Sequence, residues 1–155
     1  MNGSNSLKIS GGGYLIAAKG WILYCHREDK SKEDLADYKV WNFNGEPQYI
    51  QYITGRNSGD CREGFYTTDW KLQKFSLHNA LTEKVKEKPV CLEEMLNLSR
   101  KLAKGTFFAR TDFYVLRDGS IRFGEITFFP MSGMERWHPE KMDLVMGEKI
   151  MLGSI

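Results

Sequence analysis

The chain has 155 residues, enough for one domain with a hydrophobic core, and its 41% hydrophobic and 27% charged residues are typical of a globular protein. The formal charge of +2, from 22 basic and 20 acidic residues, excludes the basic excess expected of a nucleic-acid-binding domain. Three widely spaced cysteines without a CxxC motif argue against a disulfide framework or a zinc site, and no run of about 18 apolar residues predicts a membrane span, so a cytoplasmic location is expected.

The front of the chain predicts little regular structure. Residues 1–6 are small and polar, and three glycines at 11–13 separate short candidate strands at 7–10 and 14–18. From residue 37 the pattern is clearer. Residues 38–43 alternate, the Asn44-Gly45 pair is a strong hairpin signal, and 48–53 predicts the return strand.

The second half of the chain predicts one well-defined helix and a second hairpin. After a polar loop at 55–64, a short strand at 65–70 and an irregular stretch at 76–89, residues 91–104 predict a helix that ends before Gly105. Its apolar face carries Leu92, Met95, Leu96, Leu102 and Ala103. Strands at 107–116 and 120–129 flank Asp118-Gly119, and 139–152 predicts a terminal helix with Pro139 in its first turn. The expected fold class is α+β, an antiparallel sheet packed on helices in a single domain.

The second hairpin carries the candidate residues for catalysis and ligand binding. With a two-residue turn, its register places Asp112 opposite Glu125 and Arg110 opposite Thr127, all on one face. The other face should be buried, and it carries Phe107, Ala109, Thr111, Phe113, Val115, Ile126 and Phe128. Two opposed carboxylates repel each other, so a proton, a basic neighbour or a bound cation must compensate. Mg²⁺ takes such oxygen ligands and arginine binds phosphate, so the group is a candidate for phosphoryl transfer. The alternative is a solvated polar face on which Arg110 bridges the two acids.

The hairpin segments 108–114 (Phe-Ala-Arg-Thr-Asp-Phe-Tyr) and 123–130 (Phe-Gly-Glu-Ile-Thr-Phe-Phe-Pro) resemble the metal-binding signature of ATP-grasp ligases, in which an Arg-x-Asp strand precedes a Glu-x-Asn strand. The order of motifs is similar to that of the TupA-like branch, named for teichuronopeptide biosynthesis. It comprises Asp-Tyr-Lys at 37–39, Phe-Asn-Gly at 43–45, the two strands above, and Gly-Met-Glu-Arg at 133–136. The resemblance runs from about 37 to 147.

The resemblance implies a set of site residues. Asp112 and Glu125 would bind Mg²⁺ or Mn²⁺, with Thr127 in place of the asparagine, and Arg110 would be the catalytic residue that holds phosphate or the acyl-phosphate transition state. Lys39 would contact a phosphate of ATP. The front of the chain resembles a lysine and glycine-rich ATP loop only through Lys8, Gly11, Gly12 and Gly13, for which a plain turn is the alternative. Residues 1–36 would be a divergent or truncated front part and 37–152 the ATP-grasp core.

The function implied by the resemblance is that of an ATP- and Mg²⁺-dependent carboxylate–amine ligase, or its C-terminal half, in cell-wall or surface polysaccharide biosynthesis. Its substrate would be a small molecule or a saccharide. The main alternative is a non-catalytic nucleotide- or metal-binding module derived from that fold. A glycosyltransferase is a weaker alternative because no Asp-x-Asp motif occurs. A homodimer stays open, since a truncated sheet would expose an edge.

Overall fold

The computed structural model describes residues 8–9, 13–14, 36–54, 61–116 and 118–152. A six-stranded sheet has the order β6-β5-β4-β3-β7-β8, and all its neighbouring strands are antiparallel except β5 and β6. The strands are β3 (Ala36–Phe43), β4 (Glu46–Thr54), β5 (Arg62–Thr67), β6 (Ala80–Leu81), β7 (Phe108–Val115) and β8 (Ile121–Thr127). The helices are α1 (Leu92–Ala103), α2 (Lys141–Glu148) and the short 3₁₀ segment η1 (Pro130–Gly133). The predicted α+β class is confirmed.

The hairpin of β3 and β4 forms as its turn sequence predicts. Asn44 and Gly45 have φ angles of 53° and 82°, the left-handed pair required by a tight hairpin turn whose twist matches its strands. The register then pairs Val40 with Ile50 and places Lys39 beside Gln51. Side chains alternate along β3, so every second residue points to one face of the sheet and the residues between them point to the other.

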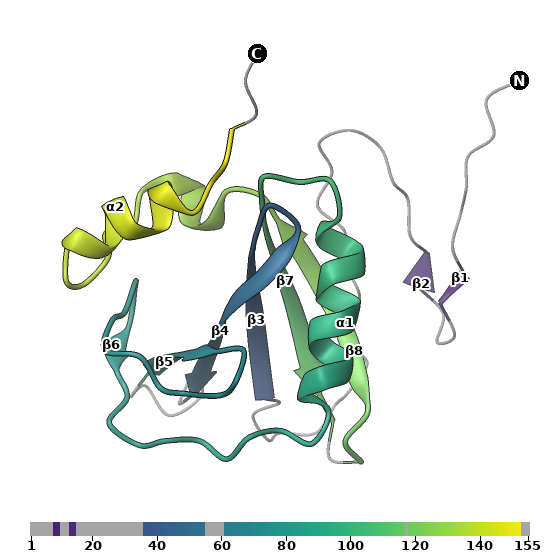
Figure 1. The fold of residues 1–155 in the computed structure, drawn as a ribbon. Helices are drawn as coiled ribbons and strands as arrows, with labels where there is room; N and C mark the ends of the chain where they lie inside the picture. Colours follow the sequence, from purple (N-terminus) through teal and green to yellow (C-terminus); the bar gives the residue numbers. More distant parts are fainter. Residues whose placement is uncertain (1–7, 10–12, 15–35, 55–60, 117, 153–155) are drawn as a thin grey trace, which may run out of the picture.

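Helix α1 covers one face of the sheet, where it packs against β3, β4 and β7 (Figure 1). The core on this face consists of Tyr38, Val40, Ile50, Tyr52, Tyr66, Trp70, Leu92, Met95, Leu96 and Phe113. The prediction for Leu102 is wrong, since its side chain is exposed. The Asn44-Gly45 turn lies against the end of α1, where a Cβ on Gly45 would stand 3.5 Å from the Ala103 carbonyl oxygen.

The face predicted to be buried in the second hairpin is buried only along its middle. Ala109, Thr111 and Phe113 are buried against α1, whereas Phe107 and Phe128 are exposed. Phe107 precedes β7 and Phe128 follows β8, so both lie beyond the sheet that α1 covers.

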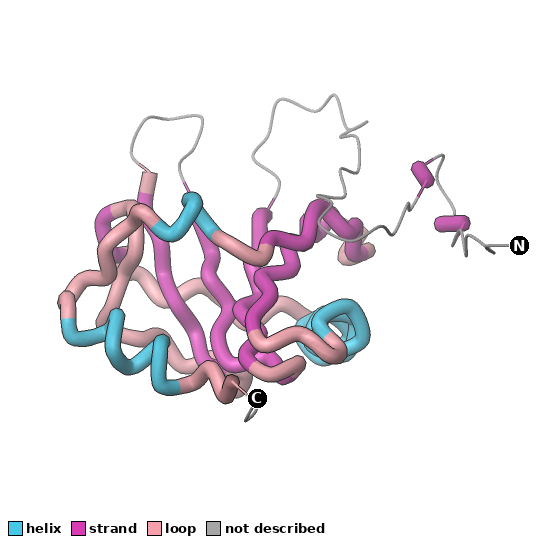
Figure 2. Tube along the Cα trace, turned by 90° about the horizontal axis from the view of Figure 1, so that it is seen from above, coloured by secondary structure: helices cyan, strands magenta, loops and turns pink. Residues whose placement is uncertain are grey.

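The other face of the sheet is covered at one end by the C-terminal segment. Its core comprises Trp41, Phe43, Phe65, Phe75, Leu77, Trp137 and Met146. Helix α2 begins at Lys141, not at Pro139 as predicted, because the chain is still paired as a strand at His138. There the backbone exchanges two hydrogen bonds of 2.8 Å with Ser76. Figure 2, viewed from above, shows the two helices at separate places along the row of strands.

The C-terminal segment is also held at its far end. The Asn44 side chain donates to the Lys149 carbonyl oxygen at 2.6 Å and accepts from the Met151 amide at 3.0 Å. The segment from His138 to Met151 is therefore attached to the sheet both before and after α2. Neither helix α1 nor helix α2, within the part of the chain described, has the length and apolar character needed to cross a lipid bilayer.

Candidate functional site

The turn between β7 and β8 is one residue longer than predicted. The Leu116 amide donates to the Ser120 carbonyl oxygen at 3.0 Å, and the Gly119 amide donates to the Leu116 carbonyl oxygen, also at 3.0 Å. Three residues therefore separate the paired ends, and Gly119 supplies the positive φ of 81° that such a loop needs. Near the turn, the register is shifted by one residue from the predicted one, so that Phe113 faces Phe123.

A bulge restores the predicted register further along the strands. Arg110 faces Thr127 as expected, and the irregularity lies opposite Asp112, where β8 contains one extra residue. Gly124 allows this, because a Cβ at this position would lie only 3.1 Å from the Asp112 carbonyl oxygen. The prediction that Asp112 directly opposes Glu125 is thus wrong in detail, since the bulge separates them, although both still face the same side.

Arg110 compensates the two carboxylates. Its Nε and Nη2 donate to the two Asp112 oxygens at 2.8 and 2.9 Å, a bidentate pair. The same Nη2 lies 2.9 Å from Glu125 Oε1 and 3.3 Å from Thr127 Oγ1. Oxygen atoms from three side chains on two strands therefore converge on one cationic nitrogen.

Strand β3 extends this cluster with a second cation. Lys39 faces Asp112 directly in the register, contacts its carboxylate, and lies 3.3 Å from Asp37. Asp37 and Asp112 are each 2% exposed, so the alternative of a solvated face does not hold for these acids, although Arg110 does bridge Asp112 and Glu125 as that alternative predicted. Among the described residues, three acids and two bases form this charged ladder across β3, β7 and β8: Asp37, Lys39, Asp112, Arg110 and Glu125.

A third buried carboxylate, Glu63 on β5, was not predicted. It is fully buried and accepts hydrogen bonds from the amides of Leu77 and His78 and from Gln51 Nε2. Gln51 in turn accepts from the Trp41 indole at 3.2 Å. The network fixes the chain around residue 77 to the sheet. No local pattern predicts it, because its partners lie 14 residues away in an irregular stretch.

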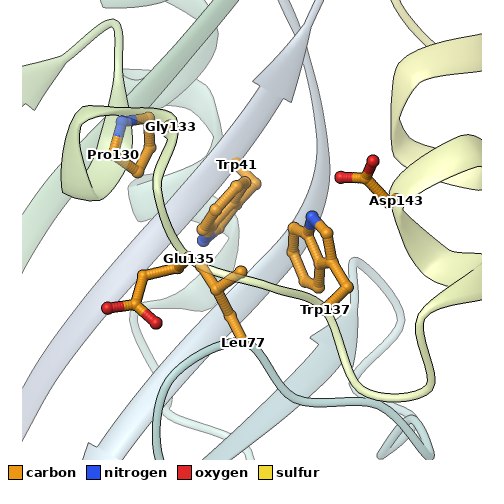
Figure 3. Close-up of a pocket in the computed structure, with 7 residues that line it drawn as sticks. All are labelled: Trp41, Leu77, Pro130, Gly133, Glu135, Trp137 and Asp143. Carbon is orange, nitrogen blue, oxygen red and sulfur yellow. The ribbon is translucent and has the colours of Figure 1, made fainter.

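Next to the ladder, a cavity of about 160 Å³ opens on the same face (Figure 3). Trp41 faces Arg110 directly in the register and forms the floor of the cavity with Trp137, whose ring centroid lies 5.2 Å away. The remaining lining residues are Leu77, Pro130, Gly133, Glu135 and Asp143. The rim includes the 3₁₀ segment η1, in which Met131 and Ser132 have positive φ angles of 49° and 55°. Left-handed backbone at non-glycine residues is strained and clusters at functional sites.

The predicted front loop does not join this site within the described residues. Lys8 lies in β1 (Lys8–Ile9) and Gly13 in β2 (Gly13–Tyr14), a separate two-stranded sheet that Figure 1 shows apart from the six-stranded one. Gly11 and Gly12 lie outside the described residues. Their predicted role in ATP binding stays a prediction.

The donors assembled at the ladder are carboxylate and hydroxyl oxygens, the ligand type that hard divalent cations prefer. Within the described ranges, no group of three or more histidine, cysteine, aspartate or glutamate side chains could hold a metal ion by itself. Any ion here would need ligands of other kinds, such as the Thr127 hydroxyl or the oxygens of a phosphate.

The fold and the ladder together define a class of domain, an α+β sheet whose central strands present buried acids and bases. The chain belongs to the TupA-like ATP-grasp family, whose model matches residues 19–151. The family uses ATP with Mg²⁺ or Mn²⁺. No curated protein and no solved structure was found to match the chain.

Proposed function

We propose that the chain supplies the Mg²⁺- and phosphate-binding part of an ATP-dependent carboxylate–amine ligase that acts in cell-wall or surface polysaccharide biosynthesis. The observation that carries the proposal is the convergence of Asp112, Glu125 and Thr127 oxygens on Arg110 Nη2. Three oxygens around one cationic nitrogen are a donor set that a divalent cation can also use. The family match supports the reaction class, and the resemblance supports the pathway.

The residues fit Mg²⁺. Asp112 Oδ2 and Glu125 Oε1 each lie 2.9 Å from the same nitrogen, so they cannot be farther apart than twice that distance. That is within the span of about 8 Å beyond which one ion, with ligand bonds near 2.1 Å, could not join their carboxyl groups. Mg²⁺ bound by Asp112, Glu125 and Thr127 would neutralise phosphate oxygens of ATP.

The chain's own bases would then act on the phosphates. In the proposed reaction the substrate carboxylate attacks the γ-phosphorus of ATP, and ADP leaves with the electrons of the broken P–O bond. The amine nitrogen attacks the resulting acyl phosphate at carbon, inorganic phosphate leaves, and the amine loses a proton. Arg110 and Lys39 stabilise the negative charge that develops on the phosphoryl oxygens, because both are already fixed in a site largely shielded from water.

A second candidate is a non-catalytic nucleotide- or metal-binding module. One observation favours it, because Arg110 already bridges both carboxylates and so reduces their repulsion without a bound ion. Phosphoryl transfer also depends on holding the γ-phosphate from both sides, and the described residues supply only one side. We therefore expect weak Mg²⁺-dependent nucleotide binding with little turnover. A cytoplasmic location and homodimerisation remain predictions.

Calorimetric titration with ATP, with and without Mg²⁺, followed by a phosphate-release assay, tests the proposal. The expected result is binding that requires Mg²⁺ and is about tenfold weaker in Glu125→Gln, with slow phosphate release. Asp69→Asn is the matched control, because this exposed acid lies in a turn away from the ladder. Absence of binding at millimolar ATP would contradict the proposal. Rapid phosphate release that Asp112→Asn abolishes would instead show that the chain completes the site, with Lys8 and the glycines as candidates.

A further inference from the structure

The cavity beside the ladder has an aromatic floor and an acidic wall. Trp41 and Trp137 meet edge to face, and their rings bound the cavity from below. Figure 3 shows the Asp143 carboxylate pointing from α2 toward the two indole rings. Glu135 lies on the opposite side and pairs with His78 at 2.9 Å. Aromatic faces and carboxylates together attract organic cations, through the ring quadrupole and through charge-assisted hydrogen bonds.

One donor at this cavity has no protein partner among the described residues and is open to solvent. Trp137 is 6% exposed, and its indole N–H donates to no group among the residues that the structure describes. The indole of Trp41, by comparison, donates to Gln51 at 3.2 Å. The Asp143 carboxylate likewise has no ion-pair partner within the described part of the chain. A donor without a protein acceptor, beside an exposed carboxylate without a cation, is an arrangement that a ligand with both kinds of group would satisfy.

The size of the cavity restricts the ligand. Its 160 Å³ is equivalent to about five water molecules at about 30 Å³ each. A nucleotide or a drug-sized ligand needs roughly 300–1,000 Å³. The cavity therefore accommodates a small head group, and the remainder of a larger molecule would extend out of it over η1.

The position of the cavity relates it to the ladder. Trp41 and Arg110 are direct neighbours on β3 and β7, and the Cβ atoms of such pairs lie about 4.5–5.5 Å apart. A head group on Trp41 would thus lie one residue pair from the guanidinium that we propose to hold the transferred phosphate. Two substrates of a single reaction require this proximity.

We propose that this cavity binds the amine of the acceptor, a primary ammonium on a small polar skeleton, with Asp143 and Glu135 as its anionic partners. The Trp137 indole N–H donates to a hydroxyl or carbonyl oxygen next to the amine, and the aromatic floor packs against its carbon atoms. The role of this amine as the nucleophile rests on the proposed ligase function, whereas its binding rests on the cavity alone.

The test follows the indole N–H signals of ¹⁵N-labelled protein by NMR during titration with ethanolamine, and separately with ethylene glycol, its neutral counterpart. The chain has four tryptophans. Trp70, whose indole donates to the Lys86 carbonyl oxygen under the other face of the sheet, is an internal control. Ethanolamine should shift the Trp137 signal saturably while Trp70 stays constant, and ethylene glycol should shift neither. Titrations with glucosamine and with lysine then distinguish an amino sugar from an amino acid as the source of the ammonium.

Asp143→Asn should weaken ethanolamine binding at least about tenfold, whereas Glu148→Gln, which removes an acid from the same helix outside the cavity, should not. Equal shifts with ethylene glycol, an equal response of Trp70, or unchanged binding in Asp143→Asn would each overturn the proposal. A titration of the same sample with ATP and Mg²⁺ keeps the two proposals separate. If β7 signals respond to ATP but Trp137 never responds to an amine, the amine site is wrong and the phosphate site stands.

Discussion

Arg110 and Glu125 form a 2.9 Å ion pair across β7 and β8, next to the bulge at Gly124. The same guanidinium holds Asp112, so one side chain fixes the relative position of both acids. The pair therefore has two consequences that can be measured separately, one for stability and one for ligand binding.

Removing the guanidinium should destabilise the fold. Arg110→Ala leaves Asp112 buried with only Lys39 as a cation, and breaking a buried ion pair from one side typically costs about 3–5 kcal/mol. Arg100→Ala is the matched control, since Arg100 pairs with Glu46 on an exposed surface, where such pairs contribute less than about 1 kcal/mol. Urea unfolding measures both. An equal loss of unfolding free energy in the two variants would show that the ladder stabilises the fold no more than a surface ion pair does.

The two acids of the site should respond differently to neutralisation. Glu125 is partly exposed, so Glu125→Gln should change the free energy of unfolding little and weaken Mg²⁺-dependent nucleotide binding by about tenfold, or about 1.4 kcal/mol. Asp112→Asn leaves two buried cations without their shared carboxylate, so it should lower the unfolding midpoint as well. Thermal unfolding and calorimetry on the same samples check this. Tight Mg²⁺-dependent binding in Glu125→Gln would contradict its role as a ligand.

The bulge should depend on the missing side chain of Gly124. In Gly124→Ala, the new Cβ would lie 3.1 Å from the Asp112 carbonyl oxygen and 3.1 Å from the Tyr114 ring, so β7 must move. We expect a loss of about 1–3 kcal/mol, as for other overpacked sites, together with weaker nucleotide binding. Gly147→Ala on α2 is the control, because nothing lies within 4 Å of the added atom. It should be neutral, or stabilising by up to about 1 kcal/mol. A fully stable Gly124→Ala would mean that the bulge is easily remodelled.

The buried Glu63 should hold the segment around residue 77 in place. Glu63→Ala removes the acceptor of the Leu77 and His78 amides and of the Gln51 and Asn79 side chains, so four donors lose their partner. Each buried donor left unsatisfied costs about 1–3 kcal/mol. Hydrogen exchange should show the Leu77 and His78 amides exchanging much faster. The exchange rates of the α1 amides should rise only as much as the loss of global stability requires. Unchanged protection of these two amides would exclude the anchoring role.

The sequence predicts local features well because they depend on local chemistry. Asn44-Gly45 predicts its hairpin because both residues tolerate positive φ, and alternation predicts that Arg110, Asp112, Glu125 and Thr127 share a face. The sequence also indicates Gly105 as the residue beyond α1, and its φ of 78° confirms this.

The remaining features depend on distant parts of the chain. The three-residue turn and the bulge offset each other, and alternation alone cannot detect two compensating shifts. The burial of the charged ladder depends on Lys39, which reaches Asp112 from a strand 73 residues earlier. The cavity depends on Trp137, which comes to lie against Trp41 only after the C-terminal segment folds back.

The attachment of the segment from His138 to Met151 at both of its ends has a consequence for how such a protein can diverge. The bases and acids of the ladder lie on β3, β7 and β8, whereas Glu135, Trp137 and Asp143 lie on or next to this segment. Substitutions here that keep the Ser76 pairing and the Asn44 contacts would reshape the cavity without disturbing the strands. The selectivity of the cavity for its small molecule could then change in evolution while phosphate binding by the ladder on the same sheet face stays the same.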